Sequence, residues 1–178
     1  MIKLNIDESS EDQPIKTIYF SNEQGECFRV AHFLGEKLVL DEMTQFTNSK
    51  EIESETLFNE CYEVLAYRKF IKNSDGKYYG TEDYARVDGQ LKKLNSIFVE
   101  IISNEDHHTK HKWFNGLDEY VYSTEVGDHQ EFRYVKPNGE TIDYSELHDF
   151  LSVNKPLDFY DVKNKYLSQI VKEYKTNK

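Results

Sequence analysis

The segment TEDYARVDGQLKKLNSIFVEI, residues 81–101, carries the strongest periodic pattern of the chain and decides the expected fold. Its apolar residues recur at steps of three and four, the spacing that places side chains on one face of a helix. Glu82 and Asp83 suit the first turn because of the helix dipole. Gly89 weakens a helix by about 1 kcal/mol relative to alanine without having to break it. We therefore expect a helix from about Thr81, with a buried stripe formed by Tyr84, Val87, Leu91, Leu94, Phe98 and Ile101.

A second long helix is expected just before this one, from about Ser54. Leu57, Cys61, Val64 and Leu65 follow one another at helical spacing and would form its buried stripe. The two cysteines, Cys27 and Cys61, match no zinc or redox spacing, so both are expected to be small core residues in a reducing compartment.

Four short segments near the start of the chain predict an antiparallel β-meander. They are rich in β-branched and aromatic residues and are separated by turn-like stretches: IKLNI (2–6), KTIYFS (16–21), ECFRVAHFL (26–34) and EKLVL (36–40). His32 shares a strand face with Phe28, Val30 and Leu34, which favours a hydrogen-bonded core or edge histidine over a ligand.

The C-terminal third predicts a hairpin and two helices. In EFRYVKPNGETIDY, residues 131–144, the Pro-Asn-Gly sequence favours a tight turn. Asp143 and Glu146 have the spacing of a capping box before a short helix, and Asp158 and Asp161 repeat it before the terminal helix. The buried stripe of that helix would be Phe159, Val162, Tyr166 and Ile170.

Together these elements predict a single α+β domain over residues 1–178, with residues 1–14 partly flexible and residues 175–178 frayed. A chain of 178 residues buries roughly 70% of its unfolded surface, enough for a core without disulfides or metal. An aromatic content of 14% argues against disorder. No secretory signal or membrane span is apparent, so we expect a cytoplasmic protein.

NEDHHTKHKW, residues 104–113, is the segment that most resembles a metal site. On a helix, His107 and His111 would face the same side, as zinc ligands do. His108 stands where a metallohydrolase carries its glutamate base, and a third ligand would have to come from Asp106, Asp128, His129 or His148. A solvated helix end explains the segment more simply, and no cofactor is expected.

Net charge is −11, and it is distributed in blocks. Residues 1–63 hold fourteen acids and five bases, and residues 117–149 hold nine acids and two bases; the segments between and after them are weakly basic. Such a surface repels nucleic acid and anionic membranes and attracts basic partners. No phosphate-binding loop, dinucleotide fingerprint, serine-hydrolase elbow, kinase signature or calcium loop is present.

The second acidic block interleaves acids with tyrosines, a composition that suits contact with a cationic surface. An ordinary hairpin with tyrosines inward and acids outward would have the same sequence. The expected partner-binding residues are Asp118, Glu119, Tyr120, Tyr122, Glu125, Asp128, Glu131, Tyr134, Glu140 and Asp143.

Two classes of function are consistent with these observations. The first is a non-catalytic acidic binding protein of the immunity-protein, antitoxin or anti-defence inhibitor type, which blocks a basic protein such as a nucleic-acid-binding enzyme or toxin, including by imitating nucleic acid. It would bind neither nucleic acid nor membranes directly. The alternative is a metal-assisted hydrolase that uses His107, His108 and His111 with nearby acids. A structural subunit is a third possibility, and the sequence does not set the oligomeric state.

Overall fold

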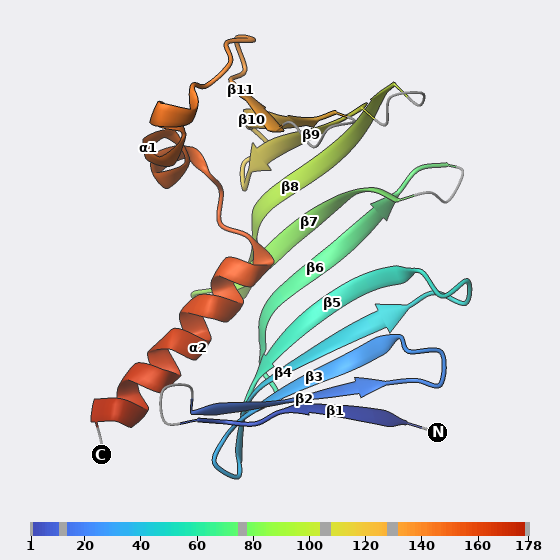
Figure 1. Ribbon diagram of the computed structural model, residues 1–178, viewed down its shortest axis with the longest axis vertical. Coiled ribbons are helices and arrows are strands. Elements are labelled where there is room, and N and C mark those ends of the chain that lie inside the picture. Colours follow the sequence, from blue (N-terminus) through green and yellow to red (C-terminus); the bar gives the residue numbers. More distant parts are fainter. Residues whose placement is uncertain (1, 11–13, 75–77, 104–107, 128–131, 177–178) are drawn as a thin grey trace. The chain divides into compact units, whose positions relative to one another are not determined.

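The computed structural model describes residues 2–10, 14–74, 78–103, 108–127 and 132–176. Within these ranges a long series of strands is followed by two helices (Figure 1). The strands are β1 (Lys3–Asp7), β2 (Ile15–Ser21), β3 (Cys27–Leu34), β4 (Lys37–Phe46), β5 (Ile52–Asn59), β6 (Val64–Lys72), β7 (Tyr78–Val87), β8 (Gln90–Ser103), β9 (His108–Asn115), β10 (Tyr120–Val126) and β11 (Phe132–Val135). The helices are α1 (Tyr144–Asn154) and α2 (Phe159–Thr176).

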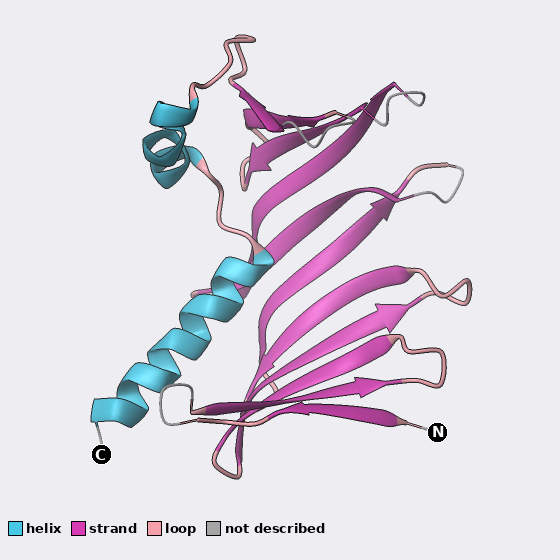
Figure 2. Cartoon of the chain, viewed as in Figure 1, coloured by secondary structure: helices cyan, strands magenta, loops and turns pink. Residues whose placement is uncertain are grey.

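The strands belong to one sheet whose order is the order of the chain, from β1 to β11 (Figure 2). Registers from β1 to β6 and from β8 to β11 are antiparallel. Each strand therefore pairs with its neighbours in sequence, through short connections. Contacts divide the chain into two compact units: a first unit of Met1–Lys69, Ala85–Leu91 and Phe159–Lys178, and a second unit of Phe70–Tyr84 and Lys92–Asp158.

The core of the first unit forms where α2 packs on the sheet. Leu40, Leu57, Ala66 and Phe159 are fully buried against one another, and each large apolar side chain buried in this way stabilises the fold by roughly 1.5–3 kcal/mol. The guanidinium of Arg68 covers the ring of Phe159 at 5.2 Å from its centroid. The terminal helix predicted from the sequence is α2, and Phe159 of its predicted stripe is buried. The short helix predicted before it is α1.

The long helix expected from Thr81 is wrong: residues 81–101 form the end of β7, a two-residue turn and most of β8. Asp88 and Gly89 both adopt positive φ, at 52° and 79°, as the two central residues of a type I′ hairpin turn do. Val87 and Leu91, expected in the buried stripe, are 40% and 49% exposed. The three-and-four spacing therefore arises from two strands joined by a turn.

The helix expected from Ser54 is also wrong, because that segment forms β5 and β6. Asn59 and Glu63 bound the turn between these strands, so the supposed helical stripe runs across a chain reversal. Cys61 lies in the turn and is exposed, whereas Cys27 is half-buried. The expected α+β fold with two long central helices is therefore wrong. Among the described residues the chain forms an antiparallel sheet, and its helices, α1 and α2, both follow the last strand.

A five-residue turn recurs along the sheet. In each copy the first residue receives a backbone bond from the fourth and donates one to the fifth, and the fourth residue has positive φ. The fifth residue is always a glutamate. Among the described residues the copies are Asn22–Glu26, Thr47–Glu51, Asn59–Glu63, Asn115–Glu119 and Lys136–Glu140. Where the first residue is asparagine, its side chain accepts two turn amides and donates to the glutamate.

The N-terminal meander and the buried, hydrogen-bonded histidine expected from the sequence are confirmed. The N-terminal meander corresponds to β1–β4, and His32 is buried and lies 3.0 Å from the Thr17 hydroxyl through Nδ1. The Pro-Asn-Gly turn follows β11, although the second arm of that hairpin is reduced to a bridge between Val135 and Thr141. Parts of the ends expected to be flexible, residues 1, 11–13, 177 and 178, lie outside the described residues. Neither described helix is both long and apolar enough to cross a membrane.

Candidate functional site

The residues expected to bind a partner lie in the second unit, along β10, β11 and the connections around them. Asp128 and Glu131 lie outside the described residues. The others occupy four places. Asp118 and Glu119 lie in the β9–β10 turn, Tyr120, Tyr122 and Glu125 on β10, Tyr134 on β11 with Glu140 in the turn after it, and Asp143 immediately before α1.

Of the two tyrosines of β10, Tyr122 is buried in the unit and Tyr120 is half-buried. Tyr122 is 2% exposed and stacks on Trp113 with ring centroids 5.5 Å apart. It also meets Phe150 of α1 edge-on at 6.0 Å, so α1 is held to the sheet by an aromatic contact. Tyr134 packs beside Tyr122 at 6.1 Å. Tyr122 is therefore a core residue and does not belong to an exposed binding surface.

Several acids of the same segment have cations as partners within the protein. Glu125 Oε1 lies 2.9 Å from Lys110 Nζ across β9 and β10, and this hydrogen bond raises the pKa of Lys110. Asp118 pairs with Lys93, and Glu140 pairs with Lys136 at 3.1 Å. Glu119 Oε2 accepts from Asn115 Nδ2 at 2.8 Å. These contacts reduce the negative charge that the β10 region presents to a partner.

The acids of α1 are different. Asp143, Glu146 and Asp149 are exposed and follow at steps of three, so they lie on neighbouring positions of one helix side. In the described part of the chain none of the three carboxylates pairs with a lysine or arginine, and the Asp149 carboxylate lies 3.3 Å from His148 Nδ1. The helix itself contains no lysine or arginine. We call these three carboxylates the α1 acidic surface.

Asp143 is the N-cap residue of α1, but its side chain makes no capping hydrogen bond. The contact at this position is a backbone one, from Glu146 N to Asp143 O at 3.0 Å. The capping-box spacing thus predicted the start of the helix correctly, but the carboxylate is not used as the motif implies. It remains directed to solvent beside Glu146.

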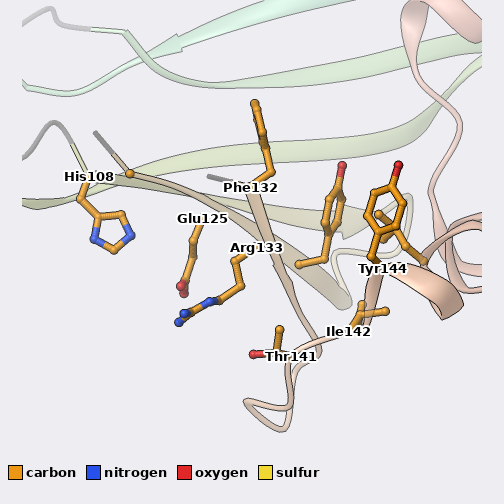
Figure 3. A pocket seen from close by; sticks show the side chains of 10 residues that line it. His108, Glu125, Phe132, Arg133, Thr141, Ile142 and Tyr144 are labelled. Atoms are coloured by element: carbon orange, nitrogen blue, oxygen red, sulfur yellow. The ribbon is translucent and has the colours of Figure 1, made fainter. Parts of the chain in front are cut away.

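A pocket of about 600 Å³ lies next to this helix. Its walls come from β9, β10, β11, the segment after β11 and the first turn of α1 (Figure 3). Phe132 and Tyr144, which contribute to it, are 65% and 92% exposed. Glu125 and Arg133, which face each other across β10 and β11, both line the pocket, so its own charges are of both signs. The lining residues are His108, Glu125, Gly127, Phe132, Arg133, Tyr134, Thr141, Ile142, Tyr144 and Leu147.

The pocket and the exposed aromatics were not identified from the sequence as a site. Phe132 and Tyr144 are aromatic residues of the second acidic block, residues 117–149, and Glu146 and Asp149 are two of its acids. Nothing in their spacing indicated that one helix would expose the acids beside an apolar hollow. Two features of the sequence could have indicated this site: the short helix contains no lysine or arginine, and its first residue is a tyrosine.

The histidine-rich segment does not have the geometry of a helical metal site. His107 lies outside the described residues, and His108 begins strand β9. His108 and His111 are three apart on an extended strand, so their side chains point to opposite faces. His111 is half-buried, and burial lowers its pKa. Among the described residues no three His, Cys, Asp or Glu side chains are grouped as metal ligands would be.

No known protein family matches the chain, and no curated protein is significantly similar to it in sequence. The site must therefore be interpreted from its own geometry.

Proposed function

We propose that this protein is a non-catalytic binding protein that attaches to a basic site on another protein through the α1 acidic surface and the adjoining pocket. In biological terms it is an inhibitor of the immunity-protein, antitoxin or anti-defence type. The observation that carries the proposal is the exposure of three carboxylates beside two exposed aromatic side chains. Among the described residues none of these carboxylates has a lysine or arginine as its partner.

The charges favour a basic partner. Glu125 on β10 is paired with Lys110 on β9, whereas Asp143, Glu146 and Asp149 face solvent at a helix that contains no lysine or arginine. Charges of one sign gathered on one surface steer an oppositely charged protein and raise the association rate. Nucleic-acid-binding enzymes and toxins have basic sites of this kind, which is why they are the expected class of partner.

The pocket supplies the contact that charge alone does not. Glu125 is paired with Lys110, and Arg133 lines the same pocket, so the pocket is not itself acidic. Phe132, Ile142 and Leu147 give it apolar walls. An aliphatic or aromatic side chain of the partner fits this pocket. Basic residues of the partner next to that side chain would then contact the α1 acidic surface. Aromatic and aliphatic anchors of this kind dominate the energy of most protein interfaces.

The test is capture of the partner from lysate of the source cells by immobilised protein, with the bound proteins identified by mass spectrometry. Glu146→Lys with Asp149→Lys should lose a partner that the wild type retains. The control, Glu53→Lys with Glu173→Lys, changes net charge by the same amount at exposed positions of the first unit and should retain it. Circular dichroism and a thermal melt establish that both variants fold. If the two variants capture the same proteins as the wild type, or the wild type captures none, the proposal is wrong.

A separate variant tests the pocket. Tyr144→Ala removes an exposed aromatic side chain from its rim and is expected to weaken binding of the captured partner about tenfold or more, as truncation of an interface anchor does. Val153→Ala, at the other end of the same helix and 83% exposed, should leave the affinity unchanged. Equal affinities for the two variants would exclude the pocket from the interface.

A further inference from the structure

The first strand, β1, ends the order of the sheet and has its neighbour β2 on one side only among the described residues. All five of its residues are exposed. Ile2, Leu4 and Ile6 alternate along the chain and are 60%, 59% and 43% exposed, so they form an apolar row on one face of the strand. An edge strand with such a row is a surface for pairing with another strand.

The amide of Ile6 shows which groups lie on the open edge. Ile6 N donates to the side chain of Asn5, with Oδ1 at 3.1 Å. Backbone groups of a strand point alternately to its two sides. The amides of Leu4 and Ile6 therefore point away from β2, whereas those of Lys3, Asn5 and Asp7 point toward it. The register partners of these three residues on β2 are Ser21, Tyr19 and Thr17. Strand pairing at the open edge would exchange the local bond from Ile6 to Asn5 for bonds between strands.

The sequence KLNID is complementary to itself in antiparallel register. With a twofold axis at Asn5, Lys3 lies opposite Asp7 of the second copy and Leu4 lies opposite Ile6. Both pairings occur twice because of the symmetry. Leu4 and Ile6 would exchange backbone bonds, and the charged pair would fall on the opposite face from the apolar row.

Other registers lack this agreement of charge. A twofold axis at Lys3 or at Asp7 sets like charges directly opposite each other, which is destabilising. An axis at Leu4 or at Ile6 sets Lys3 or Asp7 opposite Asn5. Lys3 Nζ is held by Glu23 O at 3.2 Å, and Asp7 Oδ2 accepts from Tyr19 at 3.0 Å. Both charged side chains lie on the strand face opposite the apolar row, and each would have to exchange its contact on the β2 side for the charge of the second copy.

We propose that two copies of this chain associate through β1 in antiparallel register about Asn5. The occupant of the edge is a second copy because charge, apolar row and hydrogen-bond groups all match in one register. A five-residue strand pair buries less than the roughly 1,000 Å² of a stable interface, so the dimer is expected to be weak and reversible. This inference is independent of the proposed function, which uses α1 and the pocket.

Charge exchange tests the register. Sedimentation equilibrium over about 1 µM to about 1 mM covers the range of a weak complex. Wild type should show a monomer–dimer equilibrium. Lys3→Glu should raise the dissociation constant about tenfold, because it sets acid against Asp7 at both ends. Lys3→Glu combined with Asp7→Lys restores opposite charges and should return the constant to within about threefold of wild type. A monomeric wild type, or a dimer that Lys3→Glu does not weaken, overturns the proposal.

Disulfide trapping tests the axis directly. In a background in which Cys27 and Cys61 are both serine, Asn5→Cys places two thiols opposite each other in a pair without hydrogen bonds, where the Cα atoms lie about 4.5 Å apart. Mild oxidation should give a covalent dimer in high yield. Leu4→Cys, whose register partner is Ile6, should give much less. Equal yields from the two variants would show that the strands meet only by collision, and the proposed register would then be wrong.

Discussion

Asp143 and Glu146 lie one turn apart at the start of α1 and are joined by a backbone hydrogen bond of 3.0 Å, while the Asp143 side chain caps nothing. An aspartate at an N-cap position usually contributes to helix stability through its carboxylate. Here the carboxylate is exposed beside Glu146 and Asp149, which frees it for contact with a partner. This separation of stability from binding can be measured.

Asp143→Ala tests it, because alanine removes both the charge and any capping ability of the side chain. Because the carboxylate makes no capping bond, the free energy of unfolding should change by no more than about 0.5 kcal/mol, as at an ordinary surface position. Affinity for a captured basic partner should fall, since one of three unpaired acids is lost. Urea unfolding and a binding titration measure the two quantities. A stability loss of about 1 kcal/mol or more would show that the side chain acts as a cap after all.

Gly89→Ala tests the turn that replaces the expected helix. Gly89 has a φ of 79° and no atom within 4 Å of a Cβ placed there, so the cost is conformational and should be about 1 kcal/mol of unfolding free energy. Gly127→Ala is the control, because Gly127 also has open space around it but no positive φ. It should not destabilise the protein. In a helix, Gly89→Ala would instead have been stabilising.

That turn also shows how far the sequence predicts the fold. Alternating apolar residues identified β1–β4, and apolar residues at steps of three and four identified α2. In each case a single repeat of apolar residues extends over the whole strand or helix. The helix predictions for residues 81–101 and for the segment from Ser54 were wrong because each segment spans two strands and the turn between them. Asp-Gly is a strong hairpin signal, and Asn followed by Glu at the fifth position recurs in three of the turns. These turn signals interrupt both of the segments for which a helix was predicted, and they indicate strand hairpins there.

The candidate site was predictable only in part. The acidic segment was identified from composition, but its paired acids depend on strand register, which places Lys110 opposite Glu125. Sequence spacing alone does not give the register between two strands. The acids of α1 are different because they depend on the helix alone, and that helix was predicted. Tyr122 was assigned to the binding surface, although the structure places it in the core.

Asn115→Ala tests the recurrent turn. The Asn115 side chain accepts the amides of Leu117 and Glu119 at 2.9 and 3.0 Å and donates to the Glu119 carboxylate. Loss of these bonds should lower the free energy of unfolding by about 1–2 kcal/mol, because the amides lose their acceptor. Lys136→Ala, at the first position of a turn without asparagine, should cost less. Equal losses in urea unfolding would mean that the backbone alone defines the turn.

The buried His32 predicts a pH dependence of stability. Burial and the charge of Lys163 lower its pKa to about 4 from the ordinary 6.5. The unfolded chain therefore binds a proton before the folded protein does, and stability falls as pH decreases from 6.5 towards 4. Between pH 7.5 and 5 the loss should be about 2 kcal/mol.

His32→Gln removes the titrating group and checks this assignment. Urea unfolding gives the free energy of unfolding of each protein at pH 7.5 and at pH 5. The change between the two pH values is compared between the variant and the wild type, so a difference in their stability at pH 7.5 does not matter. The variant should lose about 2 kcal/mol less than wild type over that range. If the two proteins lose the same amount, His32 is not the group responsible.

The salt dependence of partner affinity tests the central claim most directly. The dissociation constant of the captured partner should be measured by titration calorimetry at several salt concentrations for wild type, for Glu146→Lys with Asp149→Lys, and for Glu53→Lys with Glu173→Lys. Because salt screens exposed charges, affinity of the wild type and of the control should fall steeply with salt. The α1 variant should bind weakly at low salt and show little further dependence. A variant that keeps the affinity and salt dependence of the wild type would contradict binding through the α1 acidic surface.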